Sequence, residues 1–286
     1  MVRIEPYDLQ ATLKRSPKAT VCVTFNGGAW RGLFFAGVVE AIQKRFADAE
    51  LKRWAFCGTS AGAVFALALA MGFPAEDFKT LLCSAAARAR ARCLGVAFCV
   101  NTITGQIVLD MLETVSEEAL VARLRGRYAL CVTGVVGCKA CPYIVCDFDT
   151  KAELFNGIVC SCNIPLFSSL EQVFPNIRGV TAFDGGLTPD GCVPTIPSHC
   201  NVFSMCFGES ANRGCSPAPE PLPAGVTLDI AEHPPVPIAE CFKTPRTDED
   251  ARAAMCKGKD MAEAFFGSHS WAHRYDLARL QRARRL

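Results

Sequence analysis

Two kinds of hydrophobic spacing alternate along the first part of the chain. Residues 19–25 (ATVCVTF) and 54–57 (WAFC) are short runs of apolar and β-branched side chains, a pattern typical of buried strands. Between them, the apolar residues of 32–46 recur every three or four positions, which indicates a helix with one buried face. The small residues of 60–71 predict a second helix, with Gly72 as its expected C-terminal stop. The pattern therefore predicts strand, helix, strand and helix in succession.

The same alternation continues through the rest of the chain. Further elements are predicted as helices at 74–92, 103–115, 117–124 and 151–160, and as strands at 128–136, 143–148 and 201–207. The two strands on either side of Gly137 are expected to form a hairpin, and two helices are expected to close the chain, the last at 272–285. Alternating strands and helices favour the α/β fold class, here a three-layer α/β/α arrangement with a mainly parallel central sheet covered on both faces.

Seven prolines between residues 216 and 237 interrupt this pattern, because proline fits neither a helix interior nor a central strand. We therefore expect a linker or surface loop at 211–238. The other segments are expected to be an N-terminal extension at 1–18, a main domain at 19–210, and a helical segment at 239–286 that packs on the same domain.

Composition narrows the class of protein. Half of the 286 residues are hydrophobic, which is enough for a sizeable core, and a formal net charge of +2 gives no general attraction to nucleic acid. The first ten residues, MVRIEPYDLQ, lack the apolar run of a secretory signal, so an intracellular, cytoplasmic protein is expected. The 17 cysteines are accordingly expected to be reduced thiols. A zinc site is the alternative, with Cys138, Cys141, Cys160 and Cys162 as its ligands. The first two have the usual C-x-x-C spacing, but Cys160 and Cys162 form a C-x-C pair, which is one residue short of it.

Residues 56–73 (FCGTSAGAVFALALAMGF) contain no charge and carry Gly58-Thr59-Ser60-Ala61-Gly62, a G-x-S-x-G pattern. The same five residues form G-x-x-x-G, so a membrane helix is one interpretation. Just two leucines, no isoleucine, and α/β patterning on both sides favour a buried helix in a globular core instead. A strand before the motif and a helix after it would place Ser60 on a sharp turn, for which Gly58 and Gly62 leave room.

Two further glycine-containing segments carry candidate chemistry. Asn26-Gly27-Gly28-Ala29-Trp30-Arg31-Gly32 lies between a predicted strand and a predicted helix, and its consecutive glycines would expose backbone N–H groups to an oxyanion. A tight turn or a phosphate-binding loop is the alternative, although the spacing does not fit a dinucleotide-binding G-x-G-x-x-G. Asp184-Gly185-Gly186 is either an ordinary turn or, beside a nucleophilic serine, a general base on a glycine turn.

In this order, the three segments resemble the patatin-like phospholipase family, whose members have a G-G-G-x-[RK]-G loop, a G-x-S-x-G serine and a D-G-G or D-G-A aspartate. Cys162-Asn163-Ile164-Pro165-Leu166-Phe167 is similar to the segment that precedes this aspartate in the adiponutrin and adipose triglyceride lipase branch. The resemblance covers roughly residues 19–207. There are two departures: Ala29 stands at the third glycine of the loop, and Leu187-Thr188-Pro189 follows the D-G-G where the family often has Asn-Pro.

The resemblance implies a serine lipid acyl hydrolase of phospholipase A or acylglycerol lipase type, which needs no metal or organic cofactor. Ser60 would be the nucleophile and Asp184 its base, and the N–H groups of Gly27, Gly28 and Ala29 would form the oxyanion hole. The glycines that support these motifs would be Gly32, Gly58, Gly62, Gly185 and Gly186. Arg31 would steady the loop or meet a phosphate head group, and an ordinary surface ion pair is an equal alternative.

Two other functions stay open. A Ser-Asp-His triad of an α/β-hydrolase esterase is compatible with the chain order of Ser60, Asp184 and any of the later histidines, His199, His233, His269 and His273. A catalytically silent interaction protein on a membrane would keep the fold without turnover.

The implied substrates are glycerolipids or phospholipids at a membrane or lipid-droplet surface, so peripheral membrane association is expected, with or without a protein coactivator. Residues 273–286 carry five arginines and one aspartate. This segment is expected either to lie on an anionic membrane or to pack its leucines on the domain.

Overall fold

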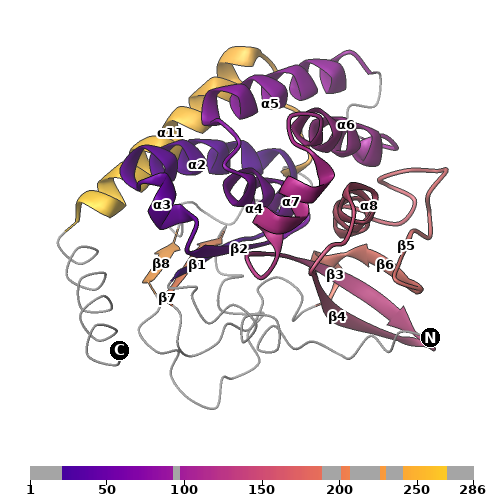
Figure 1. The fold of residues 1–286 in the computed structure, drawn as a ribbon. Coiled ribbons are helices and arrows are strands. Elements are labelled where there is room, and N and C mark those ends of the chain that lie inside the picture. Colours follow the sequence, from indigo (N-terminus) through magenta and orange to yellow (C-terminus); the bar gives the residue numbers. More distant parts are fainter. Residues whose placement is uncertain (1–20, 93–96, 189–200, 207–225, 230–240, 269–286) are drawn as a thin grey trace, which may run out of the picture.

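The computed structural model describes residues 21–92, 97–188, 201–206, 226–229 and 241–268. Its centre is an eight-stranded sheet with the order β5-β6-β3-β2-β1-β7-β8, in which β4 pairs with β3 off this path (Figure 1). The strands are β1 (Val21–Phe25), β2 (Trp54–Thr59), β3 (Tyr128–Val136), β4 (Lys139–Cys146), β5 (Asn176–Ile177), β6 (Val180–Asp184), β7 (Asn201–Cys206) and β8 (Val226–Asp229).

The sheet is mainly parallel. The neighbouring strands β3, β2, β1, β7 and β8 run parallel to one another, while β4, β5 and β6 join antiparallel at the β3 side. The predicted α/β class and mainly parallel sheet are therefore confirmed. The hairpin expected around Gly137 is formed by β3 and β4, and Gly137 adopts a left-handed φ of 61° at its turn.

One strand corrects the sequence-based prediction. The proline-rich region was expected to hold no regular structure, but Val226–Asp229 forms β8 and pairs in parallel with β7. These four residues lie between Pro223 and Pro234 and contain no proline, so each of them has a backbone N–H for the ladder. The high proline count of the whole region led to a prediction of irregular structure, although this short segment contains no proline.

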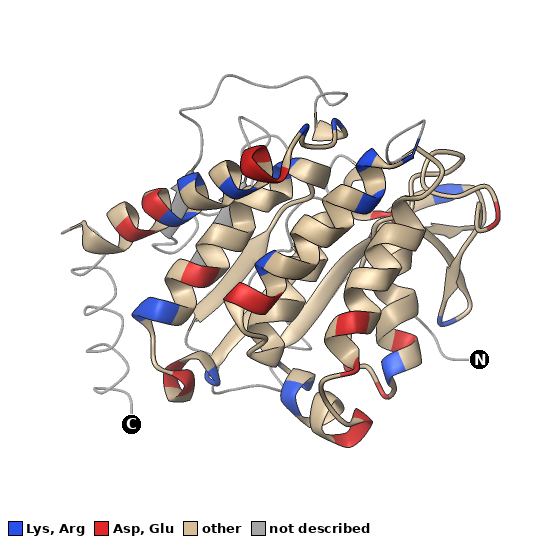
Figure 2. Ribbon diagram, turned by 90° about the horizontal axis from the view of Figure 1, so that it is seen from above, with Lys and Arg blue, Asp and Glu red and all other residues tan. Residues whose placement is uncertain are grey.

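The helices follow the predicted order, with ends that differ by a few residues, except for a short helix at Asp48–Leu51 that was not predicted. They are α2 (Leu33–Arg45), α3 (Asp48–Leu51), α4 (Ala61–Met71), α5 (Ala75–Arg90), α6 (Val100–Leu112), α7 (Glu117–Leu124), α8 (Lys151–Ser161) and α11 (Asp248–Gly267). The long ones lie on one face of the sheet (Figure 1). Seen from above, they run side by side over the strands, with acidic and basic residues interspersed (Figure 2). Because the long described helices share one face, they do not form the second helical layer that the alternation predicts, and that layer stays a prediction. The helix predicted at 272–285 lies outside the described residues.

Helix α4 lies in the middle of the core. Its residues from Gly62 to Met71 are all buried, and Gly72 ends it in the expected left-handed conformation. The Phe65 ring packs against rings from α2 and α5 at centroid distances of 5.7 and 5.4 Å. None of the described helices combines the length and the apolarity that crossing a membrane requires. The apolar stretch 56–73 is therefore a core strand followed by a short core helix, as the globular interpretation predicts.

Helix α11 packs closely along α2, where two glycines let the backbones touch. A Cβ atom on Gly37 would lie 1.8 Å from the Met255 carbonyl oxygen, and one on Gly258 would lie 1.9 Å from that of Phe34. Glu40 is buried beside this contact, and it forms ion pairs with Lys44, Lys79 and Lys259, which come from α2, α5 and α11. Helix α11 is thus fixed to the helical layer that covers the sheet.

Candidate active site

Ser60 lies on the sharp turn between β2 and α4. Its φ of 55° and ψ of −132° are sparsely populated by residues other than glycine, so the backbone is strained at this residue. The two motif glycines permit the turn: a Cβ on Gly58 would lie 2.2 Å from the Gly62 carbonyl oxygen, and one on Gly62 would lie 2.3 Å from that of Phe25. The expectation that Gly58 and Gly62 leave room for a tight strand–helix junction therefore matches the geometry.

A buried serine supports this turn from behind. The Ser60 backbone N–H donates to Ser161 Oγ over 2.9 Å, and the Ser161 hydroxyl donates to the Cys131 carbonyl oxygen over 2.6 Å. Ser161 is fully buried at the end of α8, so it connects the strained turn to β3 and α8. Sequence analysis missed this residue, because nothing local marks a serine whose partner is 101 residues away.

Strand β3 brings Asp184 to the same place. Because β4 pairs with β3 along residues 129–136, it occupies one edge of β3, and β2 and β6 must share the other edge. Strand β2 runs parallel to β3 and ends with Thr59 opposite Cys131. Strand β6 runs antiparallel and ends with Asp184 opposite the next residue, Val132. The carboxyl ends of β2 and β6 therefore meet along the same edge of β3. Both strands end at this point, and the chain leaves the sheet after each of them.

The Asp184 carboxyl group is buried and faces the serine. It accepts a hydrogen bond over 2.8 Å from the Gly186 backbone N–H, and the Ser60 hydroxyl lies close enough to act on it as a second donor. Burial raises the pKa of Asp184 to about 6, and these two donors limit that rise by favouring the charged form. Gly185 has no room for a side chain, since its Cβ would lie 2.7 Å from the Cys131 carbonyl oxygen. The structure thus brings together the serine and the aspartate that the sequence singled out.

The glycine loop lies against the serine on its other side. A Cβ on Gly27 would be 3.0 Å from Ser60 Cβ, so this position borders Ser60 directly. The loop continues into a single 3₁₀ turn, η1 (Ala29–Gly32), in which the Arg31 N–H donates to the Gly28 carbonyl oxygen over 2.9 Å. Ala29 adopts a φ of 46°, a left-handed conformation that glycine adopts without steric cost and that strains alanine. The departure from the family pattern at Ala29 therefore falls on a position where it adds strain.

Arg31 and Gly32, the last two residues of the loop, both contact other parts of the protein. The Arg31 guanidinium donates to Cys241 Sγ over 3.9 Å, which places it between the loop and the segment that precedes α11. Gly32 leaves room for the Phe65 ring, since a Cβ there would lie 2.7 Å from a ring carbon. The first contact is compatible with Arg31 steadying the loop, and that role stays a prediction beside its alternatives.

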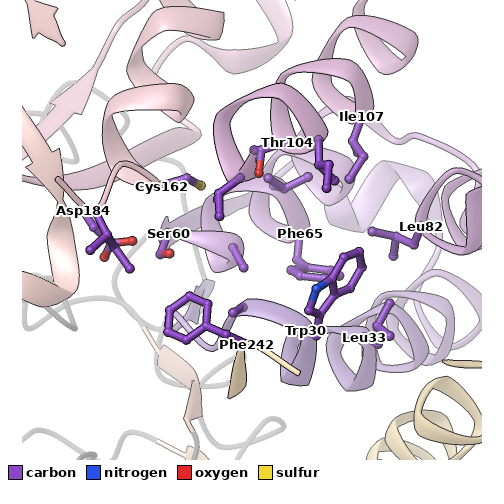
Figure 3. A pocket seen from close by; sticks show the side chains of 16 residues that line it. Trp30, Leu33, Ser60, Phe65, Leu82, Thr104, Ile107, Cys162, Asp184 and Phe242 are labelled. Atoms are coloured by element: carbon purple, nitrogen blue, oxygen red, sulfur yellow. The ribbon is translucent and has the colours of Figure 1, made fainter. Parts of the chain in front are cut away.

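An apolar cavity of about 90 Å³ opens beside Ser60 (Figure 3). Its walls are mostly hydrophobic side chains from η1, α2, α4, α5, α6, the segment after α8 and the segment before α11: Ala29, Trp30, Leu33, Ala61, Val64, Phe65, Leu82, Val100, Ile103, Ile107, Ile164 and Phe242. The polar groups come from Ser60, Asp184, Thr104 and Cys162. Such a cavity accommodates a hydrocarbon chain, and the nucleophile and the carboxyl group lie together at one side of it (Figure 3).

Cys162 and Thr104 are site residues that sequence analysis did not assign a role in this pocket. The Cys162 thiol is buried and interacts with the hydroxyls of Thr104 and Ser60. Burial raises its pKa well above the ordinary range, and the nearby Asp184 charge adds to the rise. Cys162 is therefore a neutral thiol at neutral pH, and it is an inert neighbour of the serine rather than a competing nucleophile.

Several sequence-based alternatives fall partly or wholly outside the described residues. His199, His233, His269 and His273 all lie there, as does the arginine-rich segment 273–286. The zinc alternative is not supported: within the described ranges, no three His, Cys, Asp or Glu side chains lie close enough together to hold a metal ion. The cysteines that the structure describes are free thiols, as expected.

Comparisons with known proteins agree with the fold and the order of the motifs. The family described as patatin-like phospholipase matches residues 23–194. A 1-acylglycerol-3-phosphate O-acyltransferase of Mus musculus is 26% identical over 194 residues, which are 68% of this chain and 45% of that protein. Patatin-like phospholipase domain-containing protein 2 of Homo sapiens is 27% identical over 169 residues, which are 58% of this chain and 32% of that protein. The chain therefore spans less than half the length of these curated relatives.

Among solved structures, VipD from Legionella pneumophila has a TM-score of 0.50 at 14% identity, and the match covers 88% of this chain and 67% of that one. At this identity the likeness concerns the fold alone. The curated relatives include the branch that the segment before Asp184 resembles, so the resemblance drawn from the motifs is confirmed.

Proposed function

The chain belongs to the patatin-like phospholipase family, and on that premise we propose that it is a serine acyl hydrolase that cleaves ester bonds of glycerolipids. The observation that carries the proposal is the position of the Ser60 hydroxyl beside the buried Asp184 carboxyl group, on which it acts as a hydrogen-bond donor that lowers the pKa of that carboxyl. A serine hydroxyl is a weak nucleophile until a base takes its proton, and here a carboxylate lies beside it.

In the proposed reaction, Ser60 Oγ attacks the ester carbonyl carbon while its proton passes to Asp184. The tetrahedral intermediate collapses, the lipid alcohol leaves with the proton from Asp184, and an acyl-serine remains. Water then attacks the acyl-serine, again with Asp184 as the base, and the fatty acid is released. A pKa of about 6 suits this role, because the carboxyl group is mostly ionised at neutral pH yet basic enough to accept a proton.

The negative charge of the tetrahedral intermediate would be stabilised by two elements that meet at Ser60. Backbone N–H groups of Gly27, Gly28 and Ala29 are the proposed oxyanion hole, and the contact of Gly27 with Ser60 supports their placement. Helix α4 begins at the next residue, Ala61, and the helix dipole favours negative charge near this N-terminus. One such donor contributes roughly 3 kcal/mol to transition-state stabilisation.

The walls of the cavity support an acyl chain as the group that binds beside the serine. A hydrocarbon chain placed among Trp30, Phe65 and Ile103 would lose its contact with water, which is the main favourable term for binding it. We therefore propose lipids with long acyl chains as substrates, at the surface of a membrane or droplet, and a protein that associates with such a surface from the cytoplasm.

Acyl transfer is a second candidate, because the similar mouse protein is named an acyltransferase. The same acyl-serine would then react with a hydroxyl group of a second lipid in place of water. The chemistry up to the acyl-serine is identical, so the two activities differ only in the acceptor that reaches Ser60.

A labelling experiment tests the proposal. A fluorophosphonate probe should modify the full chain at Ser60, and Ser60→Ala should abolish both the labelling and the release of fatty acid from a panel of phospholipids, lysophospholipids and acylglycerols. Adding a lysolipid acceptor distinguishes transfer from hydrolysis by the products. A chain that folds but takes up no probe would be the silent interaction protein, and the proposal would be wrong.

A further inference from the structure

Two exposed hydrophobic residues beside the cavity have an unusual backbone conformation. Phe98 is 44% exposed with a φ of 63°, and Leu166 is 64% exposed with a φ of 62°. Bulky side chains seldom occupy this left-handed region, and each occurrence carries strain. The fold therefore holds two large apolar side chains toward solvent in conformations that the chain alone would avoid.

These residues adjoin the lining of the cavity along the chain. Phe98 lies two positions before Val100, and Leu166 lies two positions after Ile164, and both Val100 and Ile164 line the cavity. The two loops are joined to each other, since the Phe98 N–H donates to the Phe167 carbonyl oxygen over 2.6 Å.

A ring contact connects the same loop to the cavity wall. The Phe167 ring packs on Phe242, a further lining residue, at a centroid distance of 4.8 Å. We call Phe98 and Leu166 the apolar rim.

The other strained positions sharpen this interpretation. Six residues other than glycine have a left-handed φ in the described parts of the chain. Ala29 and Ser60 line the cavity, and Phe98 and Leu166 are the rim. The remaining two, Asp147 and Arg178, are joined by a hydrogen bond from the Arg178 guanidinium to the Asp147 carbonyl oxygen over 3.0 Å. Strained backbone thus concentrates at the cavity and its entrance, as it does at functional sites.

We propose that the apolar rim is the surface by which this protein docks on a lipid bilayer, with Phe98 and Leu166 inserted among the acyl chains. The inference rests on the proposed function, because a lipid whose acyl chain enters the cavity must leave a bilayer at the cavity entrance. Continuity between rim and cavity lets that chain move from one apolar environment to another without crossing water.

Two features favour a fluid lipid phase over a protein partner as the occupant. The rim side chains project singly from two loops, and they need no matching pocket in order to be buried among acyl chains. A basic residue also lies in the vicinity, since the exposed Arg92 is near enough to Cys99, the residue after Phe98, for its charge to act to lower the pKa of that thiol. Its charge would meet lipid phosphate groups at the level of the head groups.

Asparagine substitutions provide a test that does not depend on loss of stability. Asn tolerates left-handed φ values better than Phe or Leu, so the double variant Phe98→Asn, Leu166→Asn should unfold at the same temperature as wild type or higher. Co-sedimentation with phosphatidylcholine vesicles, in a Ser60→Ala background that prevents turnover, should show partitioning reduced by about tenfold or more. Each single variant should show an intermediate loss, which keeps the test valid if the double variant does not fold.

Leu109→Gln is the matched control, because Leu109 is also 44% exposed but lies on α6 with an ordinary helical backbone. It should bind vesicles as wild type does. The proposed docking surface would be wrong if the rim variants bound vesicles as well as wild type. It would also be wrong if the control lost as much binding as they do, or if wild type did not bind at all. A protein that binds vesicles through the rim but hydrolyses no ester would instead remove the proposed function and leave the surface standing.

Discussion

Two junctions in this protein are packed through glycines, and they differ in what the close contact achieves. At the β2–α4 junction, Gly58 and Gly62 allow a turn in which Ser60 is held at a φ of 55°. At the α2–α11 junction, Gly37 and Gly258 allow two regular helices to touch with no positive φ in either helix. The first contact holds a strained residue in place, and the second increases the packed area between helices. The same lack of a side chain thus serves chemistry in one place and stability in the other.

The two junctions also differ in the environment of their buried carboxyl groups. Asp184 is a buried carboxyl group whose donors in the described parts of the chain, the Ser60 hydroxyl and the Gly186 N–H, carry no charge, and burial raises its pKa to about 6. Burial also acts to raise the pKa of Glu40, but hydrogen bonds with Lys44, Lys79 and Lys259 lower it to about 2. The site therefore keeps a carboxylate that destabilises the fold at neutral pH, while the helical junction keeps one that stabilises it.

The largest expected effect comes from Asp184→Asn. The amide cannot accept the serine proton, so ester hydrolysis should fall by roughly 10³-fold or more. The free energy of unfolding should nevertheless rise by about 1–3 kcal/mol at pH 7, because the native pKa of about 6 lies above the ordinary value of 3.8 and ionisation disfavours the fold. Turnover assays and chemical denaturation of the same samples check both effects. A variant that is inactive and also less stable would show that Asp184 serves the fold.

Gly37→Ala should have the opposite profile. The new methyl group would meet the Met255 carbonyl oxygen, so the free energy of unfolding should fall by about 3 kcal/mol while turnover per folded molecule is unchanged. Gly267→Ala is the matched control, because no heavy atom lies within 4 Å of the position of its Cβ. If both variants denature alike, the α2–α11 contact does not stabilise the fold as described.

Glu40→Gln should lower stability by about 2 kcal/mol at pH 7, and the difference from wild type should depend on pH. Because the folded pKa is depressed to about 2, the stabilisation is complete above the unfolded value of 4.5 and is lost as the pH falls through about 2. Denaturation curves between pH 7 and pH 3 measure this trend. Glu76→Gln is the control, since Glu76 pairs with Lys79 but is 73% exposed, and it should change little. A difference between wild type and Glu40→Gln that stays constant with pH would contradict the ion-pair explanation.

The smallest expected effect comes from Ala29→Gly, which restores the residue that the family has at this position. Glycine tolerates the φ of 46° without the clash that alanine makes, so stability should rise by up to about 1 kcal/mol. The loop geometry is already fixed by its neighbours, and kcat should change by less than a few-fold. A loss of stability would show that the left-handed conformation at Ala29 is not strained.

The sequence predicted most of the parallel sheet and the serine turn, because both rest on local patterns. The runs at 19–25 and 54–57 are unbroken, and the spacing of Gly58 and Gly62 around Ser60 is visible within five residues. Strand β6 was not predicted, although Val180–Asp184 (VTAFD) is rich in β-branched and aromatic residues. It is short, and the glycine turn that follows it is the stronger local signal.

What could not be predicted depends on contacts between distant segments. The shared edge of β3, on which β2 and β6 meet, involves residues from three parts of the chain. The support of Ser60 by Ser161 and the left-handed φ of Ala29 are likewise set by packing, which no local pattern records.

The central claim is that Asp184 alone activates Ser60, and it is tested most directly in a variant without histidine. The chain has four histidines, and replacing all of them with alanine removes every possible triad base at once. Hydrolysis of a water-soluble ester is then measured from pH 5 to pH 9. The account predicts a kcat/KM within a few-fold of wild type, with a fall below about pH 6 as Asp184 becomes protonated. A folded variant that has lost activity by orders of magnitude would contradict the account and favour a Ser-Asp-His triad.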